Sequence, residues 1–226
     1  MIGFSDSSDI TNCYATGNVT GGGRVGGLVG INEASPIRYC YATGNVSGVN
    51  PVGGLVGYSS NLGNSIINCV AANDSVIKIS GSSGRILGFI YDAYGIYSNN
   101  YANEDMVIVS SIGGEDGTGK SMATLKSFDF YNTSGNWSSG AWDIDENDNP
   151  AKIWKICKYG SLPYFQWQQG IACHTETDFG LIFDKATEKF YLDIYANGAV
   201  NPVYEYTGQS GKWSFKNDTL YLNGFE

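Results

Sequence analysis

The chain has 226 residues, a formal net charge of −9 and a pI near 4.5, and 42% of its residues are hydrophobic. Because like charges repel, this acidity argues against nucleic-acid backbones and anionic membrane surfaces as partners. No stretch approaches the roughly 18 apolar residues of a membrane span, which argues against direct membrane insertion. Residues 1–6 also lack the basic and apolar regions of an export signal, so we expect none within this chain.

The first half of the chain repeats itself. Residues 12–19 (NCYATGNV) return as residues 39–46 (YCYATGNV), and residues 25–30 (VGGLVG) return as residues 52–57. Both pairs give a period of 27 residues (40 − 13 and 52 − 25), so the two blocks belong to one repeating unit. A third copy, over residues 68–88, is less similar, and a fourth begins at Asn99. Residues 1–3 resemble the end of a preceding copy, so we expect the array to continue upstream.

Each repeat has the length and composition of one coil of a β-solenoid. Its apolar runs are short, β-branched and separated by Gly, Asn and Ser, and none keeps a helical period for three turns. We therefore predict an all-β fold, a right-handed parallel β-helix in which equivalent residues of successive coils stack. Two inward-facing ladders follow from the alignment. The first consists of Cys13, Cys40 and Cys69, together with Ala15, Ala42 and Ala71 on the same face. The second consists of Leu28, Leu55 and Ile86. Glycines 26, 30, 53, 57, 84 and 88 are predicted to lie where coils turn or approach closely.

The repeated blocks GGLVG and NCYATGNV resemble GLUG repeats over residues 1–117. Such repeats occur in large secreted or cell-surface proteins of bacteria, including adhesins and the non-catalytic regions of immunoglobulin A peptidases. The resemblance implies an extracellular or cell-surface location and a role in adhesion. Residues 118–169 are similar to the stretch that commonly closes such arrays, which implies a capping segment over the last apolar edge.

The composition changes again near residue 170, where the repeat ends. Residues 179–183 and 189–195 flank a polar turn, as do residues 212–215 and 219–222, and both pairs are typical of β-hairpins. We predict a small antiparallel β module over residues 170–226.

One segment matches a nucleotide-binding motif. Residues 114–121 (GEDGTGKS) fit the pattern G-x-x-x-x-G-K-[ST], with Gly114, Gly119, Lys120 and Ser121 at its fixed positions. A phosphate loop needs a preceding strand, a following helix and a later strand that ends in a metal-binding Asp, and no alternation of strands and helices supplies them. We interpret the match as coincidental and expect no nucleotide cofactor.

A second segment resembles the start of a calcium loop. Asp143, Asp145 and Asn147 alternate as calcium ligands do. Asp148 stands where such a loop needs Gly, and Trp154 stands where it needs a bidentate Glu, which excludes an EF-hand. The two hypotheses that remain are a looser calcium site and a solvated acidic turn.

Residues for nucleophilic or metal catalysis are few. The chain has one histidine, His174, and no motif links it to Cys157. The repeated cysteines would form a ladder along an axis, which does not suit tetrahedral zinc. We therefore expect no catalytic residue and no metal centre.

The function that these patterns favour is a non-enzymatic structural or adhesive module that binds a host or bacterial surface protein or glycan. The alternative is a carbohydrate-binding or carbohydrate-active β-helix, since polysaccharide lyases and hydrolases share the fold. Charged side chains in residues 1–90 do not stack in phase, which argues against a catalytic groove. Tyr14 and Tyr41 are interpreted either as a structural aromatic ladder or as a platform for sugars.

Overall fold

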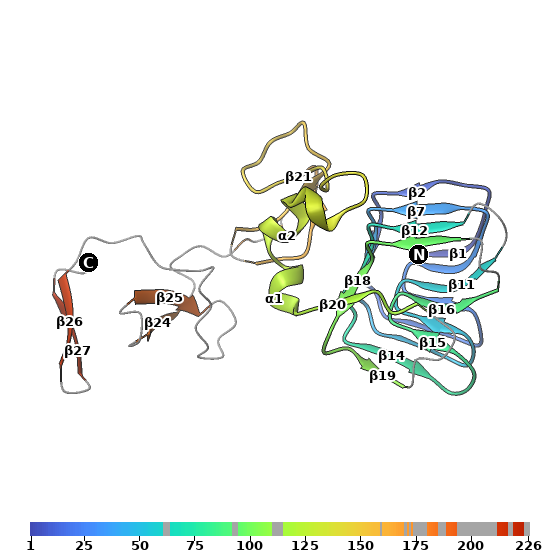
Figure 1. The fold of residues 1–226 in the computed structure, drawn as a ribbon, viewed down its shortest axis with the longest axis horizontal. Helices are drawn as coiled ribbons and strands as arrows, with labels where there is room; N and C mark the ends of the chain where they lie inside the picture. Colours follow the sequence, from blue (N-terminus) through green and yellow to red (C-terminus); the bar gives the residue numbers. More distant parts are fainter. Residues whose placement is uncertain are drawn as a thin grey trace. The chain divides into compact units, whose positions relative to one another are not determined.

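The computed structural model of the chain describes residues 1–60, 64–91, 95–109, 115–158, 160–169, 171 and 173, and the strands within residues 180–223. Residues 1–120 form a parallel β-solenoid of about four turns (Figure 1), as predicted. Each coil contributes short strands to five parallel stacks. The first holds β1 (Ile2–Asp6), β6 (Val29–Glu33), β11 (Val56–Ser60) and β16 (Leu87–Ile90), and the second β2 (Ile10–Thr11), β7 (Pro36–Arg38), β12 (Ser65–Ile67) and β17 (Ile96–Ser98). The third holds β3 (Tyr14–Ala15), β8 (Tyr41–Ala42), β13 (Val70–Ala71), β18 (Tyr101–Asn103) and β20 (Thr118–Lys120). The fourth holds β4 (Val19–Gly21), β9 (Val46–Gly48), β14 (Ser75–Lys78) and β19 (Val107–Ile108), and the fifth β5 (Val25–Gly26), β10 (Val52–Gly53) and β15 (Ser83–Gly84).

The register of the strands follows the sequence repeat and then departs from it. Tyr14 pairs with Tyr41, an offset of 27 residues (41 − 14). Tyr41 pairs with Val70, an offset of 29 (70 − 41), and Val70 with Tyr101, an offset of 31 (101 − 70). The offset therefore grows over the first four strands of this stack, while the last pair, Tyr101 with Thr118, is separated by only 17 residues (118 − 101). The strands stay parallel throughout. The changing offset explains why the third and fourth copies are hard to recognise in the sequence.

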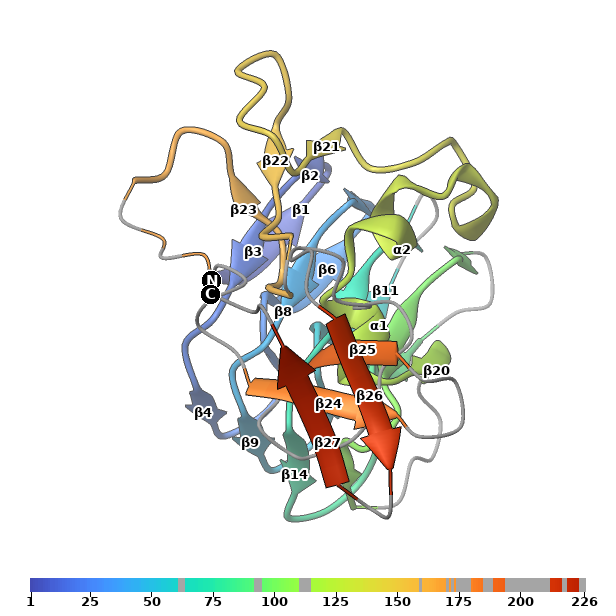
Figure 2. The same ribbon diagram turned by 90° about the vertical axis from the view of Figure 1, so that its left-hand side faces the viewer.

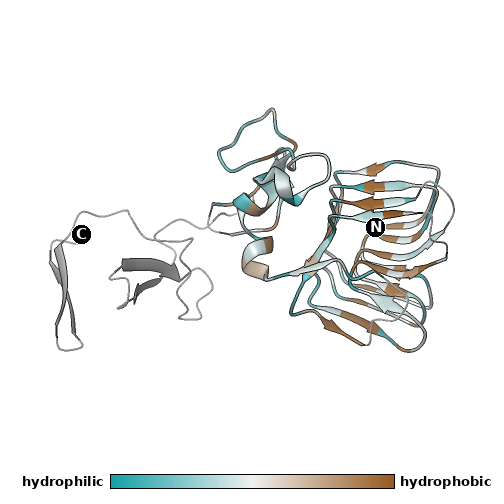
Figure 3. Cartoon of the chain, in the orientation of Figure 1, coloured by the Kyte–Doolittle hydropathy of each residue, from teal (hydrophilic) through white to brown (hydrophobic). Residues whose placement is uncertain are grey.

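The core of the solenoid consists of the predicted ladders. Cys40, Cys69, Leu55 and Ile86 are all buried, and the same cluster continues through Ala42, Ala71 and Ala102. Figure 3 shows the apolar strand segments of successive coils in line with one another. Backbone hydrogen bonds join the coils, for example from the Val70 N–H to the Cys40 carbonyl oxygen at 2.9 Å. The Cys ladder is thus a packing feature, as the repeat predicted.

The chain leaves the solenoid after β20 and runs along its side. This lateral segment, residues 121–156 and 162–167, contains α1 (Met122–Leu125), α2 (Phe128–Asn132), the 3-10 turn Ser134–Asn136, and a small sheet of β21 (Ile144–Asp145), β22 (Trp154–Lys155) and β23 (Tyr164–Phe165). Its aromatic side chains form a second core against the third stack, and Figure 2 shows the segment lying across that stack.

The capping role expected of residues 118–169 stays a prediction, and the chain after β19 contacts the solenoid at two places. At the last coil, Glu115 bridges to Leu87 and β20 pairs with β18. The lateral segment instead reaches the first coil, where the Trp154 indole N–H donates to Asn12 Oδ1 at 3.1 Å. It therefore covers the side of the solenoid as well as following its last coil.

A second compact unit comprises residues 157–161 and 168–226. Its described strands form the two predicted hairpins, β24 (Gly180–Asp184) with β25 (Lys189–Asp193), and β26 (Lys212–Lys216) with β27 (Thr219–Asn223). Among these described strands the hairpins form two separate two-stranded sheets. No helix in the described part of the chain has the length and apolar character needed to cross a bilayer.

Candidate functional site

The corner formed by the glycine-rich blocks borders a groove on the surface of the solenoid. Two adjoining hollows, of about 620 and 420 Å³, are both lined by Arg24 and Asn50. The first also contacts Ile31, and the second contacts Tyr58 and Phe89. We call these five residues the Arg24 groove.

Glycine is required at this corner because two backbone segments approach each other closely. A Cβ atom on Gly30 would lie 2.7 Å from the carbonyl oxygen of Gly3 and 3.0 Å from that of Arg24. A Cβ atom on Gly57 would lie 2.7 Å from the carbonyl oxygen of Gly30. Real Cβ atoms do not come this close to backbone atoms, so any other residue would push the strands apart. The predicted role of these glycines is confirmed, and it places Arg24 beside the first stack.

A row of apolar side chains runs along the first stack beside this corner. The strand register aligns Phe4, Ile31, Tyr58 and Phe89 in successive coils. The Tyr58 and Phe89 rings are stacked, with centroids 6.0 Å apart and planes 13° apart. The centroid of the Tyr91 ring lies 6.4 Å from that of Tyr58. Phe4 is 53% exposed. The row therefore gives the groove one apolar, partly exposed wall.

Arg24 supplies the charge of the groove. Its guanidinium carbon lies 4.9 Å from the centroid of the Tyr58 ring, within the range of a cation–π contact. The ion pairs among the described residues do not include Arg24. Beside it, Asn50 Oδ1 accepts a hydrogen bond from the Ser82 N–H at 2.9 Å. The groove thus combines aromatic faces with a cation that forms no ion pair within the described part of the chain, whose net charge is −9 over its full length.

The described residues that line the groove supply hydroxyl groups, from Thr20, Tyr58 and Ser82, but no carboxylate, imidazole or thiol. Neither hollow is lined by Asp, Glu, His or Cys. General acid–base catalysis needs a group that exchanges a proton near neutral pH, and arginine stays protonated. The chemistry that the groove offers is recognition of an anionic or hydroxyl-bearing ligand with an apolar face.

Tyr14 and Tyr41 form the predicted aromatic ladder, but it is covered. Their rings are stacked, with centroids 4.9 Å apart and planes 7° apart. Trp154 of the lateral segment lies 6.0 Å from each ring, and the Tyr41 hydroxyl donates to the carbonyl oxygen of Pro163. Burial raises the pKa of the Tyr41 hydroxyl. These contacts favour the structural interpretation over a sugar platform.

The segment that resembles a phosphate loop has a different geometry. Gly119 and Lys120 belong to β20 and pair with Ala102 and Asn103 of β18. Ser121 caps α1, a helix of only four residues, by accepting from the Thr124 N–H at 3.2 Å. The backbone of β20 therefore takes part in the sheet and does not form a loop around a ligand. Gly114 lies outside the described residues.

The three candidate calcium ligands lie around the end of β21: Asp143 precedes this strand, Asp145 is its last residue and Asn147 follows it. Asp145 Oδ2 accepts from the backbone N–H groups of Asn147 and Asn149 at 2.8 and 3.0 Å. Asp143 Oδ1 accepts from Lys152 Nζ at 2.8 Å. The Asn149 hydrogen bond in particular lowers the pKa of the Asp145 carboxyl. Among the described residues there is no group of three or more His, Cys, Asp or Glu placed to hold a metal ion. The calcium site remains a prediction, and the contacts present are those of an acidic turn.

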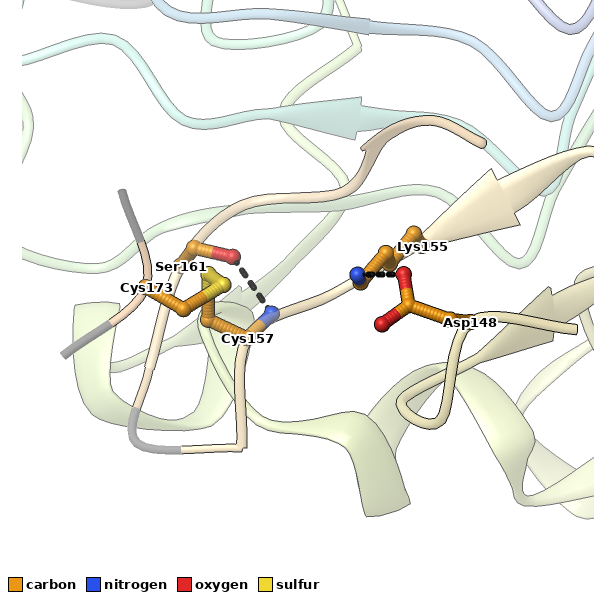
Figure 4. Close-up of a disulfide and its surroundings, with 5 residues drawn as sticks. All are labelled: Asp148, Lys155, Cys157, Ser161 and Cys173. Carbon is orange, nitrogen blue, oxygen red and sulfur yellow. Dashed lines mark hydrogen bonds and ion pairs between the residues drawn. A yellow bond between two sulfur atoms is a disulfide. The ribbon is translucent and has the colours of Figure 1, made fainter. Parts of the chain in front are cut away.

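The five cysteines divide into two classes. Cys157 and Cys173 form a disulfide within the second unit, and Cys157 N–H also donates to Ser161 Oγ at 2.9 Å (Figure 4). The three repeated cysteines are free thiols. Sequence reasoning did not find the disulfide, because a spacing of 16 residues across a non-repeated segment fits no motif. His174, the histidine considered as a catalytic partner of Cys157, lies outside the described residues.

Sequence reasoning also missed the Arg24 groove. Arg24 occurs in one coil only, because the aligned residue of the next coil is Pro51. The repeat therefore gives no ladder of basic residues. A usable signal was present in the apolar row, because Phe4, Ile31 and Tyr58 recur at the 27-residue period (31 − 4 and 58 − 31).

Comparison with known proteins supports the sequence interpretation. Residues 21–47 match the model of the GLUG motif, a span that includes Arg24 and Gly30. No curated protein matches the chain. Among solved structures, the chain is similar to one described as "a putative immunoglobulin A1 protease from Bacteroides ovatus", with 25% sequence identity and a TM-score of 0.45. The similarity covers 71% of this chain but 58% of that chain, so less than two thirds of that protein is matched. The match to the family model confirms a GLUG-type repeat over residues 21–47.

Proposed function

We propose that this chain is a non-enzymatic module of an extracellular or cell-surface protein and that the Arg24 groove is its binding face. The observation that carries the proposal is the Arg24 guanidinium, held over the Tyr58 ring and paired with no carboxylate of the described residues. A cation retained on the surface of an acidic chain favours a ligand that carries negative charge or many hydroxyl groups. The partner would be a surface protein or a glycan of a host or a bacterium.

The solenoid suits the role of a rigid support. Its coils are joined by backbone hydrogen bonds in five stacks, so the groove residues lie on strands and their corners and are held in fixed register. Binding faces placed on regular elements keep their geometry when a ligand arrives. A repetitive scaffold with one charged groove is consistent with adhesion.

Two observations support the location. GLUG repeats, which resemble residues 1–117 and match residues 21–47, occur in secreted and cell-surface proteins of bacteria. The Cys157–Cys173 disulfide is of a kind that persists in oxidising compartments.

The experiment is a binding screen with the full chain. The purified protein would be applied to an array of immobilised bacterial and host glycans and to immobilised extracellular-matrix proteins. We expect a ligand whose affinity falls at least about tenfold, or about 1.4 kcal/mol, in Arg24→Ala. Arg38→Ala is the matched control, because it removes the same charge from an exposed ion pair with Asp9, outside the groove lining.

Three results would overturn the proposal. The first is the absence of any ligand on both arrays, and the second is equal binding by Arg24→Ala and wild type. The third is catalysis, seen as the release of new reducing ends or peptides when the chain is incubated with the ligands it binds.

A further inference from the structure

A separate hollow borders the lateral segment and shares no described lining residue with the Arg24 groove. It has a volume of about 430 Å³ and is bordered by Asn12, Lys152, Phe165, Gln166 and Trp167, with Pro150 and Ile153 completing its wall. This volume is in the lower part of the roughly 300–1,000 Å³ range of small-molecule sites.

Three nearly parallel rings lead from the aromatic core to this hollow. Trp154, which is fully buried, stacks on Phe165 with centroids 4.6 Å apart and planes 25° apart. Phe165 stacks on Trp167 at 5.5 Å and 16°. Trp167 is 75% exposed. One face of its indole ring is therefore supported by Phe165, while most of the ring remains open to solvent, which is uncommon for the largest apolar side chain.

Polar groups surround this exposed ring. Asn12 Oδ1 accepts from the Trp154 indole N–H, which fixes the amide and leaves its NH₂ group as the donor. Gln166 Oε1 is buried and has no hydrogen-bond partner among the described residues, although Gln166 N–H donates to the Ile153 carbonyl oxygen at 3.0 Å. Because Gln166 lines the hollow, rotation of its side-chain amide would present this covered acceptor to a ligand hydroxyl.

The charges in the hollow are balanced. Lys152 Nζ lies 2.8 Å from Asp143 Oδ1, so the ammonium group is neutralised by a carboxylate of the same segment. An anion would gain little here, and a purely apolar ligand would leave the Asn12 and Gln166 amides unpaired. A ligand with an apolar face and hydroxyl groups along its edge satisfies the ring and the amides together.

We propose that this hollow binds a neutral sugar ring, which stacks its C–H face on Trp167 and forms hydrogen bonds with Asn12, Gln166 and Lys152. The occupant is a terminal or internal neutral hexose or N-acetylhexosamine of a glycan. The site is independent of the Arg24 groove, so either can fail without the other.

The test uses fluorine NMR of the full chain, with its five tryptophans labelled as 5-fluorotryptophan. The Trp167 signal is assigned with Trp167→Phe. Methyl glycosides of glucose, galactose, mannose and the N-acetylhexosamines are titrated into the protein. We expect at least one sugar to shift the Trp167 signal with a Kd of about 1 mM, a value suited to one ring. Isothermal titration calorimetry, which does not depend on the Trp167 signal, should show that Trp167→Ala abolishes that binding. It should also show that Gln166→Ala weakens the binding at least about threefold, as expected for the loss of one hydrogen bond.

Tyr91→Ala is the matched control because it removes a ring that is 71% exposed and lies outside the hollow. It should bind sugar like wild type. Since Trp167 is exposed, its removal should leave the Tm nearly unchanged, and lost binding will not reflect unfolding. The proposal is overturned if no sugar shifts the Trp167 signal or if the shift persists in Gln166→Ala with unchanged Kd. It is also overturned if sugar binding is lost in Arg24→Ala and kept in Trp167→Ala, which would assign the sugar to the groove.

Discussion

The solenoid and the lateral segment are both packed around apolar cores, but the side chains of the two cores differ in size and in whether they repeat. The solenoid core consists of small and branched side chains, Cys, Ala, Val and Leu, that repeat from coil to coil. The core of the lateral segment consists of large rings at positions that belong to no repeat, among them Trp137, Trp142 and Trp154. Backbone hydrogen bonds specify the first region, and side-chain shape specifies the second. Large rings such as Trp154 are therefore essential in the lateral segment, whereas glycine, which has no side chain, is essential where the coils of the solenoid approach each other.

The largest effect is expected from Trp154→Ala. Trp154 is fully buried, lies 5.2 Å from Trp142 and 4.6 Å from Phe165, and donates to Asn12. Removing a buried Trp costs about 3–5 kcal/mol, so the Tm should fall by several degrees or more. Limited proteolysis should then cleave first within residues 121–156. Trp167→Ala is the control, and equal Tm values for the two variants would contradict the comparison.

The two regions also differ in how far the sequence could predict them. Repetition revealed the solenoid, because Cys13 and Cys40, or Leu28 and Leu55, can only recur in phase if their coils stack. The lateral segment has no second copy to align, so its return to Asn12 on the first coil was not predictable. The groove and the Trp167 hollow depend on contacts between residues far apart in the sequence, such as Arg24 with Tyr58. Spacing cannot supply such contacts.

A glycine substitution tests the other side of the comparison. A Cβ atom on Gly44 would overlap the carbonyl oxygen of Gly17, while one on Gly17 meets nothing within 4 Å. The two positions are equivalent in the repeat, and neither has a positive φ. Gly44→Ala should therefore destabilise the solenoid by about 1–3 kcal/mol, as overpacking does. Gly17→Ala should be within about 0.5 kcal/mol of wild type. Chemical denaturation of both variants measures the difference, and similar midpoints would show that the coils can separate at no cost.

The cysteines offer a smaller effect that needs no substitution. Burial raises the pKa of the Cys40 thiol, and the hydrogen bond with Cys40 is the main cause of the raised pKa of Cys13. Thiolates, not thiols, react with alkylating reagents, so the ladder should resist iodoacetamide at pH 8 in the native state. The intact mass of the native protein should be lower by two hydrogens because of the Cys157–Cys173 disulfide. The three free cysteines should become alkylated only after the protein is unfolded. Rapid native labelling of Cys40 or Cys69 would contradict the packing of the ladder.

The smallest effect is expected at the acidic turn of the lateral segment. The folded-state pKa of Asp145 is lowered, so its contribution is present above the unfolded value of about 3.9 and is lost as the pH falls through the folded value. Asp145→Ala should lower the Tm slightly at pH 7, and the difference should vanish in strong acid. Asp9→Ala, in an exposed ion pair of the solenoid, is the control. Because Asp143 and Asp145 already accept hydrogen bonds from Lys152 and the backbone, millimolar calcium or a chelator should leave the Tm unchanged. A rise in Tm with calcium that Asp145→Ala abolishes would instead establish the calcium site that the spacing of Asp143, Asp145 and Asn147 suggests.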